Sequence, residues 1–232
     1  MKKKQYLCGL NWENNRMKIA IVGYGKMGHM VEEMARKRGH EIVCIIDQDT
    51  PKEVWDSAEL RSADVAIEFT TPLTAEDNVR KALQRGLKVV SGTTGWTIPQ
   101  DLQQAMDKGQ LVWKSNFSIG VNILFELNKD LAARLAPYAG YQPHITEIHH
   151  VHKLDKPSGT AKTLKEGIEQ ANMQAQVAIE SIREGEVPGT HTVVWDSEED
   201  TIVIQHIAKG RQGFALGAVI AAEKVVEPRW GC

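Results

Sequence analysis

The chain has 232 residues, with 42% hydrophobic residues, 25% charged residues and a formal net charge of −2. This composition is ordinary for a globular protein of one large or two modest domains, and the near-neutral charge argues against nucleic-acid binding. No apolar run approaches the roughly 20 residues of a membrane-spanning helix, so we expect no membrane association. The three cysteines are scattered without metal-ligand or disulfide spacing, which favours the reducing cytoplasm.

Residues 1–16 precede the first predicted strand. They begin with three lysines after Met1, but no apolar stretch follows, so the pattern is not that of a secretory signal. We expect Met17 to be the natural start and residues 1–16 to be a disordered N-terminal extension.

Strands and helices alternate over residues 17–118. Apolar, β-branched runs predict strands at residues 18–22, 41–46, 65–69, 88–90 and 111–113, and helical spacing predicts helices at residues 27–38, 73–85 and 98–108. This alternation predicts an α/β fold with a Rossmann-type, doubly wound parallel sheet.

The pattern changes after residue 118. Helices are predicted at residues 121–136 and 160–172, and extended segments at residues 141–151, 177–183, 191–196 and 201–208. This order indicates an α+β domain with a mixed or antiparallel sheet. An apolar helix at residues 213–226 could return to the first domain. We therefore expect a dinucleotide-binding domain of residues 17–118 joined by residues 213–232, and a second domain of residues 119–212.

A glycine-rich turn, Gly23-x-Gly25-x-x-Gly28, lies between the first strand and the first helix. In a dinucleotide site the first glycine allows the tight turn, the second lets the backbone approach a pyrophosphate, and the third lets helix and strand pack closely. The alternative is a purely structural glycine turn. Asp47 ends the second strand, where a carboxylate can accept hydrogen bonds from the ribose hydroxyls. Such a carboxylate repels a 2′-phosphate, which favours NADH over NADPH, although Lys52 could offset this preference.

Residues 147–161, E-I-H-H-V-H-K-L-D-K-P-S-G-T-A, concentrate titratable groups beside the predicted start of a helix. Three hypotheses compete: a solvated polar strand, a zinc site formed by His149, His150 and His152, and a site for substrate binding and proton transfer. Strand alternation places His149 on one face and the other two histidines on the opposite face, and no cysteine is near, which disfavours zinc. Histidine suits proton transfer near neutral pH, and the helix start suits a carboxylate.

This segment fits the pattern E-x-H-H-x-x-K-x-D-x-P-S-G-T-A at every fixed position. The chain thereby resembles the 4-hydroxy-tetrahydrodipicolinate reductases, also called dihydrodipicolinate reductases, of lysine and diaminopimelate biosynthesis. Further matching runs are G-T-T-G at residues 92–95, N-F-S-x-G-V-N at residues 116–122 and H-x-A-x-x-R-x-x-F-A-x-G-A at residues 206–218. The resemblance covers residues 17–223. Three departures are the compact turn, one residue shorter than in some members, the N-terminal extension, and a C-terminus that ends E-P-R-W-G-C.

The resemblance implies an NAD(P)H-dependent reduction of a cyclic imine dicarboxylate with loss of water, in a cytoplasmic homotetramer. Residues 119–212 would then form a substrate-binding and oligomerisation domain. The implied cofactor-binding residues are Gly23, Tyr24, Gly25, Lys26, Met27, Gly28, Asp47, Phe69, Thr70, Gly92, Thr93, Thr94, Ser115, Asn116 and Phe117.

The resemblance also implies that His149 is the general acid, with Lys153 as its partner. The residues implied to hold the two substrate carboxylates are His150, Lys153, Ser158, Gly159 and Thr160. No metal is implied. Two alternatives remain open: another two-domain nicotinamide oxidoreductase acting on an amino or imino dicarboxylate, and a dinucleotide-sensing regulator without turnover. A regulator would need no proton donor, so the presence of His149 weighs against it.

Overall fold

The computed structural model describes residues 16–227. Apart from Arg16, the expected N-terminal extension lies outside this range, as do residues 228–232. The described chain forms two compact units, one of residues 16–114 with 218–227 and one of residues 115–217. None of the described helices is long and apolar enough to cross a membrane.

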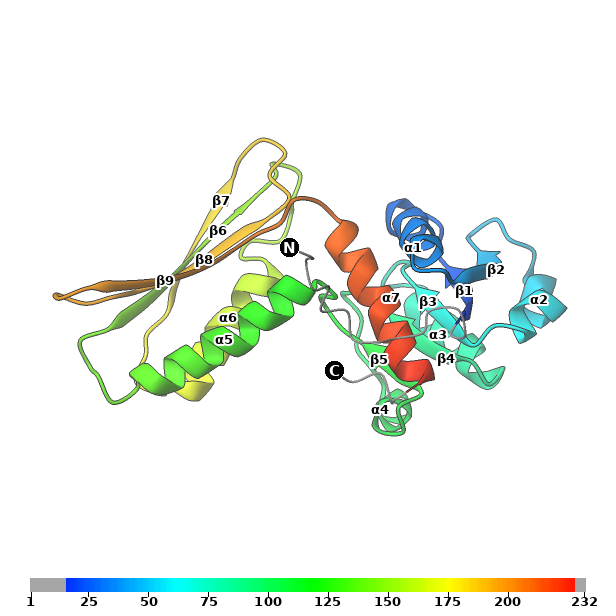
Figure 1. Ribbon diagram of the computed structural model, residues 1–232, viewed down its shortest axis with the longest axis horizontal. Coiled ribbons are helices and arrows are strands. Elements are labelled where there is room, and N and C mark those ends of the chain that lie inside the picture. The colour runs from blue at the N-terminus through cyan, green and yellow to red at the C-terminus, as the bar shows by residue number, and fades with distance from the viewer. Residues whose placement is uncertain (1–15, 228–232) are drawn as a thin grey trace, which may run out of the picture. The chain divides into compact units, whose positions relative to one another are not determined.

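The first unit is built on a five-stranded sheet in the order β2-β1-β3-β4-β5, with all pairs parallel (Figure 1). Its strands are β1 (Lys18–Val22), β2 (Glu41–Ile46), β3 (Val65–Glu68), β4 (Lys88–Ser91) and β5 (Leu111–Trp113). Its helices are α1 (Lys26–Lys37), α2 (Ala58–Arg61), α3 (Ala75–Gln84) and α4 (Gln100–Asp107), with a 3₁₀ helix at Lys52–Asp56. The predicted Rossmann-type sheet is confirmed.

The sequence did not predict the 3₁₀ helix or α2. Both are too short to show a helical period, because a four-residue helix completes only about one turn. The local signals are a proline and a serine: Pro51 precedes the 3₁₀ helix, and the Ser57 hydroxyl accepts a hydrogen bond from the Leu60 N–H at the start of α2.

The central strands β1, β3 and β4 are apolar because helices cover both faces of a doubly wound sheet. The C-terminal helix α7 (Gln212–Val226) adds polar anchors to this unit. The buried Glu223 carboxylate accepts hydrogen bonds from Arg38 at 2.6 and 2.8 Å and lies 2.9 Å from His40. The Lys88 ammonium donates to the carbonyl oxygens of Val225 and Val226, which caps the end of α7.

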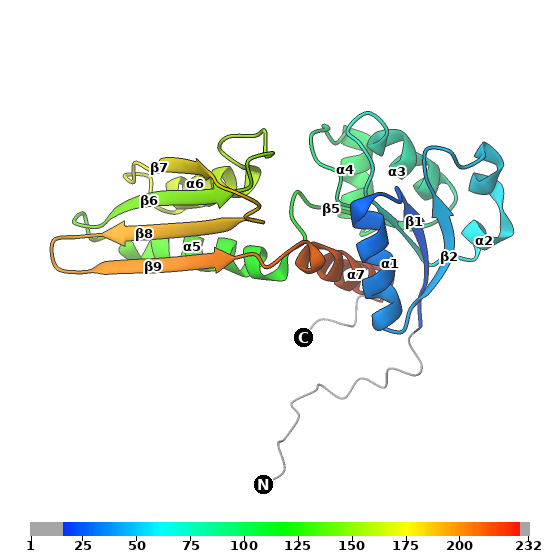
Figure 2. The same cartoon turned by 90° about the horizontal axis from the view of Figure 1, so that it is seen from above.

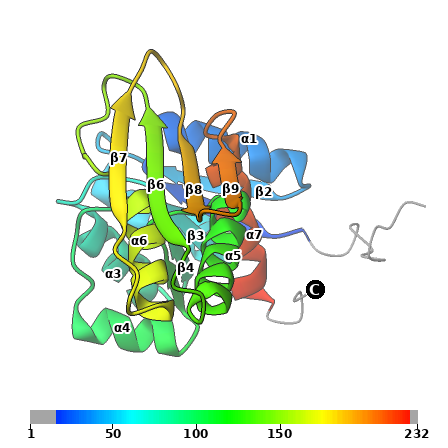
Figure 3. The same ribbon diagram turned by 90° about the vertical axis from the view of Figure 1, so that its left-hand side faces the viewer.

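The second unit is built on a four-stranded mixed sheet in the order β7-β6-β8-β9 (Figure 2). Its strands are β6 (Gln142–His149), β7 (Ala178–Arg183), β8 (Thr190–Asp196) and β9 (Thr201–Ile207). The pair β6–β7 is parallel, whereas β6–β8 and β8–β9 are antiparallel. The helices α5 (Ile119–Leu135) and α6 (Gly159–Ala171) cover one face of this sheet (Figure 3). The predicted mixed sheet is confirmed.

Strand β6 ends at His149, two residues before the predicted end, so the predicted strand alternation does not extend to residues 150–152. The backbone turns here, and the Val151 N–H bonds to the Gly185 carbonyl at 3.1 Å instead of continuing the ladder. The register within the sheet places Glu147 opposite His191 on β8 and His149 opposite Arg183 on β7. These pairings bring together side chains that are far apart in the sequence.

Candidate active site

The glycine-rich turn is sterically constrained at two of its three glycines. Gly23 has a φ of +91°, and a Cβ added to it would lie 2.1 Å from the Phe69 carbonyl oxygen. A Cβ on Gly28 would lie 2.3 Å from the Gly23 carbonyl oxygen. A Cβ on Gly25, by contrast, would meet nothing within 4 Å. The first and third glycines therefore shape the turn, whereas the second faces open space through which a ligand could approach.

Helix α1 begins at this turn with its first N–H groups uncapped. Its N-cap residue is Gly25, no side chain caps it, and the first turn contains no acidic residue. Lys26 and Met27 are the first two residues of the helix. The Tyr24 hydroxyl donates to Glu32, and the Tyr24 ring stacks on His29 with centroids 3.9 Å apart. Uncapped N–H groups at the positive end of a helix dipole form a site for an anion such as a pyrophosphate.

A buried carboxylate organises the neighbouring strand ends. Glu68, at the end of β3, accepts hydrogen bonds from the Thr70 N–H at 2.9 Å, the Thr93 hydroxyl at 2.7 Å and the Ser91 hydroxyl at 2.5 Å. The Thr93 hydroxyl also accepts a hydrogen bond from the Thr70 N–H at 2.8 Å. The expected cofactor residues that follow β3 and β4 are thus held together at the carboxyl edge of the sheet, the edge where α/β proteins bind ligands.

Two further expected cofactor residues lie against the same edge. The Phe69 ring packs over Gly92 so closely that an added Cβ there would lie 2.1 Å from the ring. Asp47 is exposed directly after β2, where the Gly23 N–H donates to the Ile46 carbonyl at 2.7 Å. Its side chain is therefore available to a ribose. The open space at Gly25 and the uncapped start of α1 fit the pyrophosphate of a dinucleotide.

In the second unit, Glu147 is fully buried on β6. One of its oxygens, Oε1, accepts hydrogen bonds from the Ser158 N–H at 3.0 Å and from Arg183 at 3.2 Å. Burial alone raises the pKa of Glu147, but hydrogen bonds from Ser158 and Ser181 and the neighbouring His149 outweigh burial and lower the pKa. Glu147 is therefore an ionised carboxylate inside the unit.

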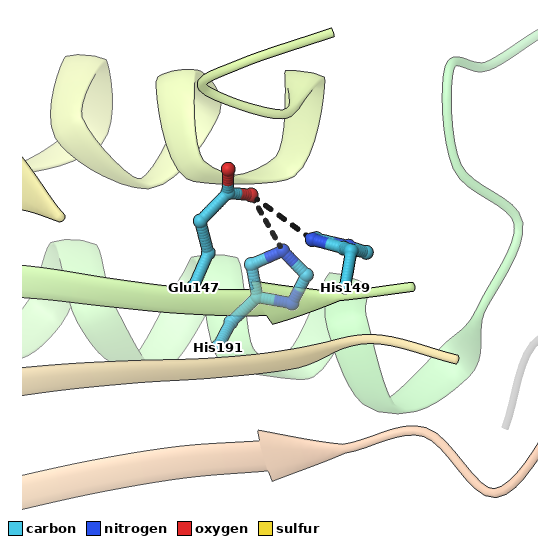
Figure 4. A group of neighbouring side chains, drawn as sticks. All are labelled: Glu147, His149 and His191. Atoms are coloured by element: carbon cyan, nitrogen blue, oxygen red, sulfur yellow. Dashed lines mark ion pairs between the residues drawn. The ribbon is translucent and has the colours of Figure 1, made fainter. Parts of the chain in front are cut away.

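The second oxygen of Glu147 faces two imidazoles (Figure 4). Oε2 lies 3.2 Å from Nδ1 of His149 and 3.9 Å from Nε2 of His191. Neither contact is aligned as a hydrogen bond, and the two imidazole rings meet edge-on with centroids 4.9 Å apart. The Ser158 hydroxyl lies 3.2 Å from Nε2 of His191. One carboxylate, two imidazoles and one hydroxyl thus form a buried polar cluster.

Both histidines of this cluster favour the neutral form. Burial lowers the pKa of His149 and outweighs the Glu147 carboxylate, which raises it, while Lys153 and Arg183 lower it further. Burial, followed by the neighbouring His149, lowers the pKa of His191 to about 4. A negative charge placed beside His149 would oppose this shift, because it stabilises the imidazolium.

The segment between β6 and α6 is anchored by Arg183. The Arg183 guanidinium donates to the Lys153 carbonyl at 3.3 Å and to the Asp155 carbonyl at 2.5 Å, besides its bond to Glu147. The Lys153 ammonium lies 2.7 Å from the Asp155 carboxylate. This anchoring keeps Lys153 close enough to His149 to influence its pKa.

Helix α6 begins beside this cluster. The Ser158 hydroxyl caps it by accepting a hydrogen bond from the Ala161 N–H at 3.2 Å, and Gly159 and Thr160 are its first residues. The Asn116 amide donates to the Thr160 hydroxyl at 3.3 Å. Of the remaining expected residues, Ser115 and Phe117 belong to this unit as well. A Cβ on Gly159 would meet nothing within 4 Å, so its side of the helix start is open.

The expected substrate residue His150 is half-buried, and its Nδ1 has no hydrogen-bond partner. Its ring lies 6.0 Å from that of His152, which in turn pairs with the exposed Glu186 at 3.0 Å. Both histidines lie beyond the end of β6, so the strand alternation expected to separate them from His149 does not extend to them.

Sequence reasoning missed His191, Arg183 and the roles of Glu147 and Asp155. Glu147 and Asp155 were visible as fixed positions of the motif, but His191 and Arg183 lie on other strands. Only the register of the sheet places them beside Glu147 and His149. A polar residue at an inward position of a predicted strand, as at His191, is the one signal that was present.

Among residues 16–227, the ligand atoms of Glu147, His149 and His191 lie within 4.8 Å of one another, the spacing of a group that could hold a metal ion. The Arg183 guanidinium on the same carboxylate offsets the negative charge that would attract a cation. We interpret the group as a positioning network for His149. A cavity of about 200 Å³ in the same unit is lined by Ser118 and residues of the segments 206–210 and 212–214, none of them an expected site residue.

The family models for dihydrodipicolinate reductase match both parts of the chain. The model described as the N-terminus matches residues 17–117, and the model described as the C-terminus matches residues 120–231. The chain belongs to the dihydrodipicolinate reductase family. It is therefore an oxidoreductase that uses NAD(P)H, and the resemblance predicted from residues 147–161 is confirmed.

Curated relatives agree with the family models. A 4-hydroxy-tetrahydrodipicolinate reductase of Christiangramia forsetii is 42% identical over 221 residues, covering 89% of this chain and 91% of the relative. One of Thermosipho africanus is 35% identical, covering 93% of this chain and 94% of the relative. The solved structure of a dipicolinate-bound dihydrodipicolinate reductase from Paenisporosarcina sp. TG-14 has a TM-score of 0.73 at 24% identity, covering 91% of this chain and 95% of that chain.

Proposed function

We propose that this enzyme reduces 4-hydroxy-tetrahydrodipicolinate to tetrahydrodipicolinate with NAD(P)H and loss of water, in the diaminopimelate route to lysine. The observation that carries the proposal is the arrangement around His149. A buried acid–base cluster lies beside a lysine and the start of a helix, which are the groups needed to bind a dicarboxylate and protonate it. The names and extensive identity of the curated relatives support the same reaction.

When bound, the nicotinamide supplies hydride to the conjugated ring of the substrate. The protein then has to orient the ring and provide a proton where negative charge develops. We assign this proton transfer to His149, with Lys153 as its charged neighbour. A bound dicarboxylate would raise the pKa of His149 against the effect of burial, so protonation of the imidazole would be coupled to substrate binding.

Glu147 acts on the reaction through His149. Its Oε2 faces Nδ1 of His149, and its other oxygen is fixed by Ser158 and Arg183. A fixed carboxylate at Nδ1 favours the tautomer or protonation state with hydrogen on Nδ1, and it stabilises the imidazolium form. Glu147 is a positioning residue in this proposal, because it acts on the substrate only through the imidazole.

The two carboxylates of the substrate are assigned to Lys153 and to the start of α6, with His150, Ser158 and Thr160 alongside. Lys153 provides a positive charge, and the first turn of α6 provides N–H groups at the positive end of the helix dipole. The open space at Gly159 supports an approach of the ligand to this backbone.

For the cofactor we propose a preference for NADH. The exposed Asp47 carboxylate at the end of β2 can accept hydrogen bonds from the ribose hydroxyls and would repel a 2′-phosphate. We assign cofactor binding also to the other residues expected from the sequence. These are the residues of the glycine-rich turn, those at the strand ends around Glu68, and Ser115, Asn116 and Phe117.

We propose a cytoplasmic homotetramer assembled through the sheet of the second unit. On β9, Ile202 and Ile204 pack against the core, whereas Val203 and Ile207 are 55% and 60% exposed on the face away from the helices. Exposed apolar side chains on a sheet face that no described helix covers are suited to assembly.

Steady-state kinetics on enzymatically generated substrate tests the proposed reaction. We expect oxidation of NADH in proportion to substrate consumed, with inhibition by 2,6-pyridinedicarboxylate, a planar mimic of the ring. Absence of turnover with both NADH and NADPH would contradict the function. A higher kcat/KM with NADPH at the same ionic strength would contradict only the cofactor preference.

A further inference from the structure

The groups assigned to a substrate carboxylate already bind a carboxylate of the protein itself. The Asp155 side chain lies 2.7 Å from the Lys153 ammonium. The backbone N–H of Gly159, the first residue of α6, also interacts with this carboxylate and lowers its pKa. A lysine and a helix N-terminus are the same two kinds of donor that would hold an incoming carboxylate.

The backbone of this segment is fixed, but the side chain is free to leave. Arg183 holds the carbonyl oxygens of Lys153 and Asp155, and Ser158 begins α6 with its N–H on Glu147. The Asp155 side chain itself is 52% exposed, so it could turn into solvent without breaking these anchors. Burial raises the pKa of Asp155, but the contacts with Lys153 and Gly159 outweigh burial and lower it.

We propose that Asp155 is an internal ligand of the carboxylate site, which a substrate carboxylate must displace from Lys153 and from the start of α6. The inference rests on the proposed function, since it takes these two groups as the carboxylate site. Asp155 thereby lowers the affinity for the dicarboxylate and returns to the site when the product leaves. In the ligand-free protein it also keeps Lys153 paired.

The direction in which one substitution changes the Kd for a dicarboxylate tests this inference. Asp155→Asn keeps a side-chain oxygen for the Gly159 N–H but removes the charge that competes for Lys153. We expect Asp155→Asn to lower the Kd for 2,6-pyridinedicarboxylate about two- to fivefold, the range for a partly exposed ion pair, by isothermal titration calorimetry at saturating NADH. If this variant does not fold, Asp155→Ser replaces it, since serine also keeps an oxygen near the helix start.

Glu186→Gln is the matched control, because it removes one negative charge of the same unit from an exposed pair with His152. The control should leave the Kd unchanged. An unchanged or higher Kd in Asp155→Asn would overturn the inference, as would equal tightening in the control, which would indicate a general charge effect.

The outcomes also separate this inference from the proposed function. If the unmodified enzyme turns over normally and Asp155→Asn does not bind the dicarboxylate more tightly, the internal ligand is contradicted and the proposed reaction stands. If the unmodified enzyme shows no turnover but Asp155→Asn binds the dicarboxylate more tightly, the proposed reaction is contradicted and the internal ligand stands. Binding that is absent from both proteins would overturn the inference together with the carboxylate site.

Discussion

The two helices that begin at the candidate binding positions, α1 and α6, differ in whether their first N–H groups are capped. Helix α1 starts at Gly25 without a side-chain cap and without an acid in its first turn. Helix α6 starts at Ser158, whose hydroxyl accepts a hydrogen bond from the Ala161 N–H, and the Gly159 N–H interacts with the Asp155 carboxylate and lowers its pKa. The positive end of a helix can thus be left open for a ligand or be partly occupied by the protein's own groups.

This difference matches the ligands assigned to the two helices. A pyrophosphate needs several N–H groups and close approach of the backbone, which the glycines of the α1 turn allow. A carboxylate needs fewer donors, so α6 can use some of its N–H groups for capping and still bind a ligand beside Lys153. An open helix start favours binding, whereas a capped one adds stability.

The largest expected effect is a loss of turnover without a loss of cofactor binding, which separates the chemistry near α6 from the dinucleotide binding at α1. His149→Gln should lower kcat by about 10²–10⁴, the usual contribution of general acid–base catalysis, while KM changes little. Kinetics should show this loss, and NADH binding measured by fluorescence should be retained. His152→Gln is the control, since His152 is exposed and pairs with Glu186. Near-full kcat in His149→Gln would mean that another group donates the proton.

Acid should destabilise the second unit through its neutral histidines. His191 has a pKa of about 4 in the folded protein, below its unfolded value of about 6.5, so the unfolded chain binds more protons between these values. Stability is therefore full above about pH 6.5 and falls as the pH drops toward 4, by about 3 kcal/mol at most. His149 and His206, whose pKa values are also lowered, act in the same direction.

Urea unfolding at a series of pH values measures this loss. His191→Gln should flatten the fall of unfolding free energy between pH 6.5 and 4, because glutamine does not titrate. A pH profile identical to that of the unmodified enzyme would show that His191 is not held neutral by burial.

In the dinucleotide-binding unit, Asp47→Ala should lower kcat/KM with NADH and lower it less with NADPH. The variant loses a charged hydrogen-bond acceptor for the ribose, a change worth about 1.5–3 kcal/mol, or roughly ten- to a hundredfold in kcat/KM. It also loses the repulsion of a 2′-phosphate. Kinetics with both cofactors at one ionic strength checks the ratio, with Asp49→Ala, also exposed after β2, as control. An unchanged ratio would show that another group, such as Lys52, decides the preference.

The smallest effect tests the two helix starts directly. Ser158→Ala should lower the free energy of unfolding by about 1 kcal/mol, because it removes the cap of α6. Gly25→Ala should leave stability nearly unchanged, because its Cβ meets nothing within 4 Å, but it should weaken NADH binding. Chemical unfolding and NADH titration of both variants check this contrast. Equal losses of stability in Ser158→Ala and Gly25→Ala would contradict the difference in capping between α6 and α1.

Local sequence determined much of this protein. The alternation of apolar runs predicted the parallel sheet, because a strand buried on both faces must be continuously hydrophobic. The turn at Gly23 was predictable because its backbone conformation and its close approach to Phe69 exclude a side chain. The motif containing His149 was recognisable because its residues are close in the sequence. These features depend on neighbouring residues or on one short segment.

Tertiary structure alone decided which distant residues meet. His191 lies opposite Glu147, and Arg183 lies opposite His149, only because β6 pairs antiparallel with β8 and parallel with β7 in one register. A shift by one residue would turn each side chain to the other face of the sheet, and the motif itself contains no information about that register. The neutrality of His191 and the occupation of Lys153 by Asp155 likewise depend on burial and side-chain geometry, which exist only in the folded protein.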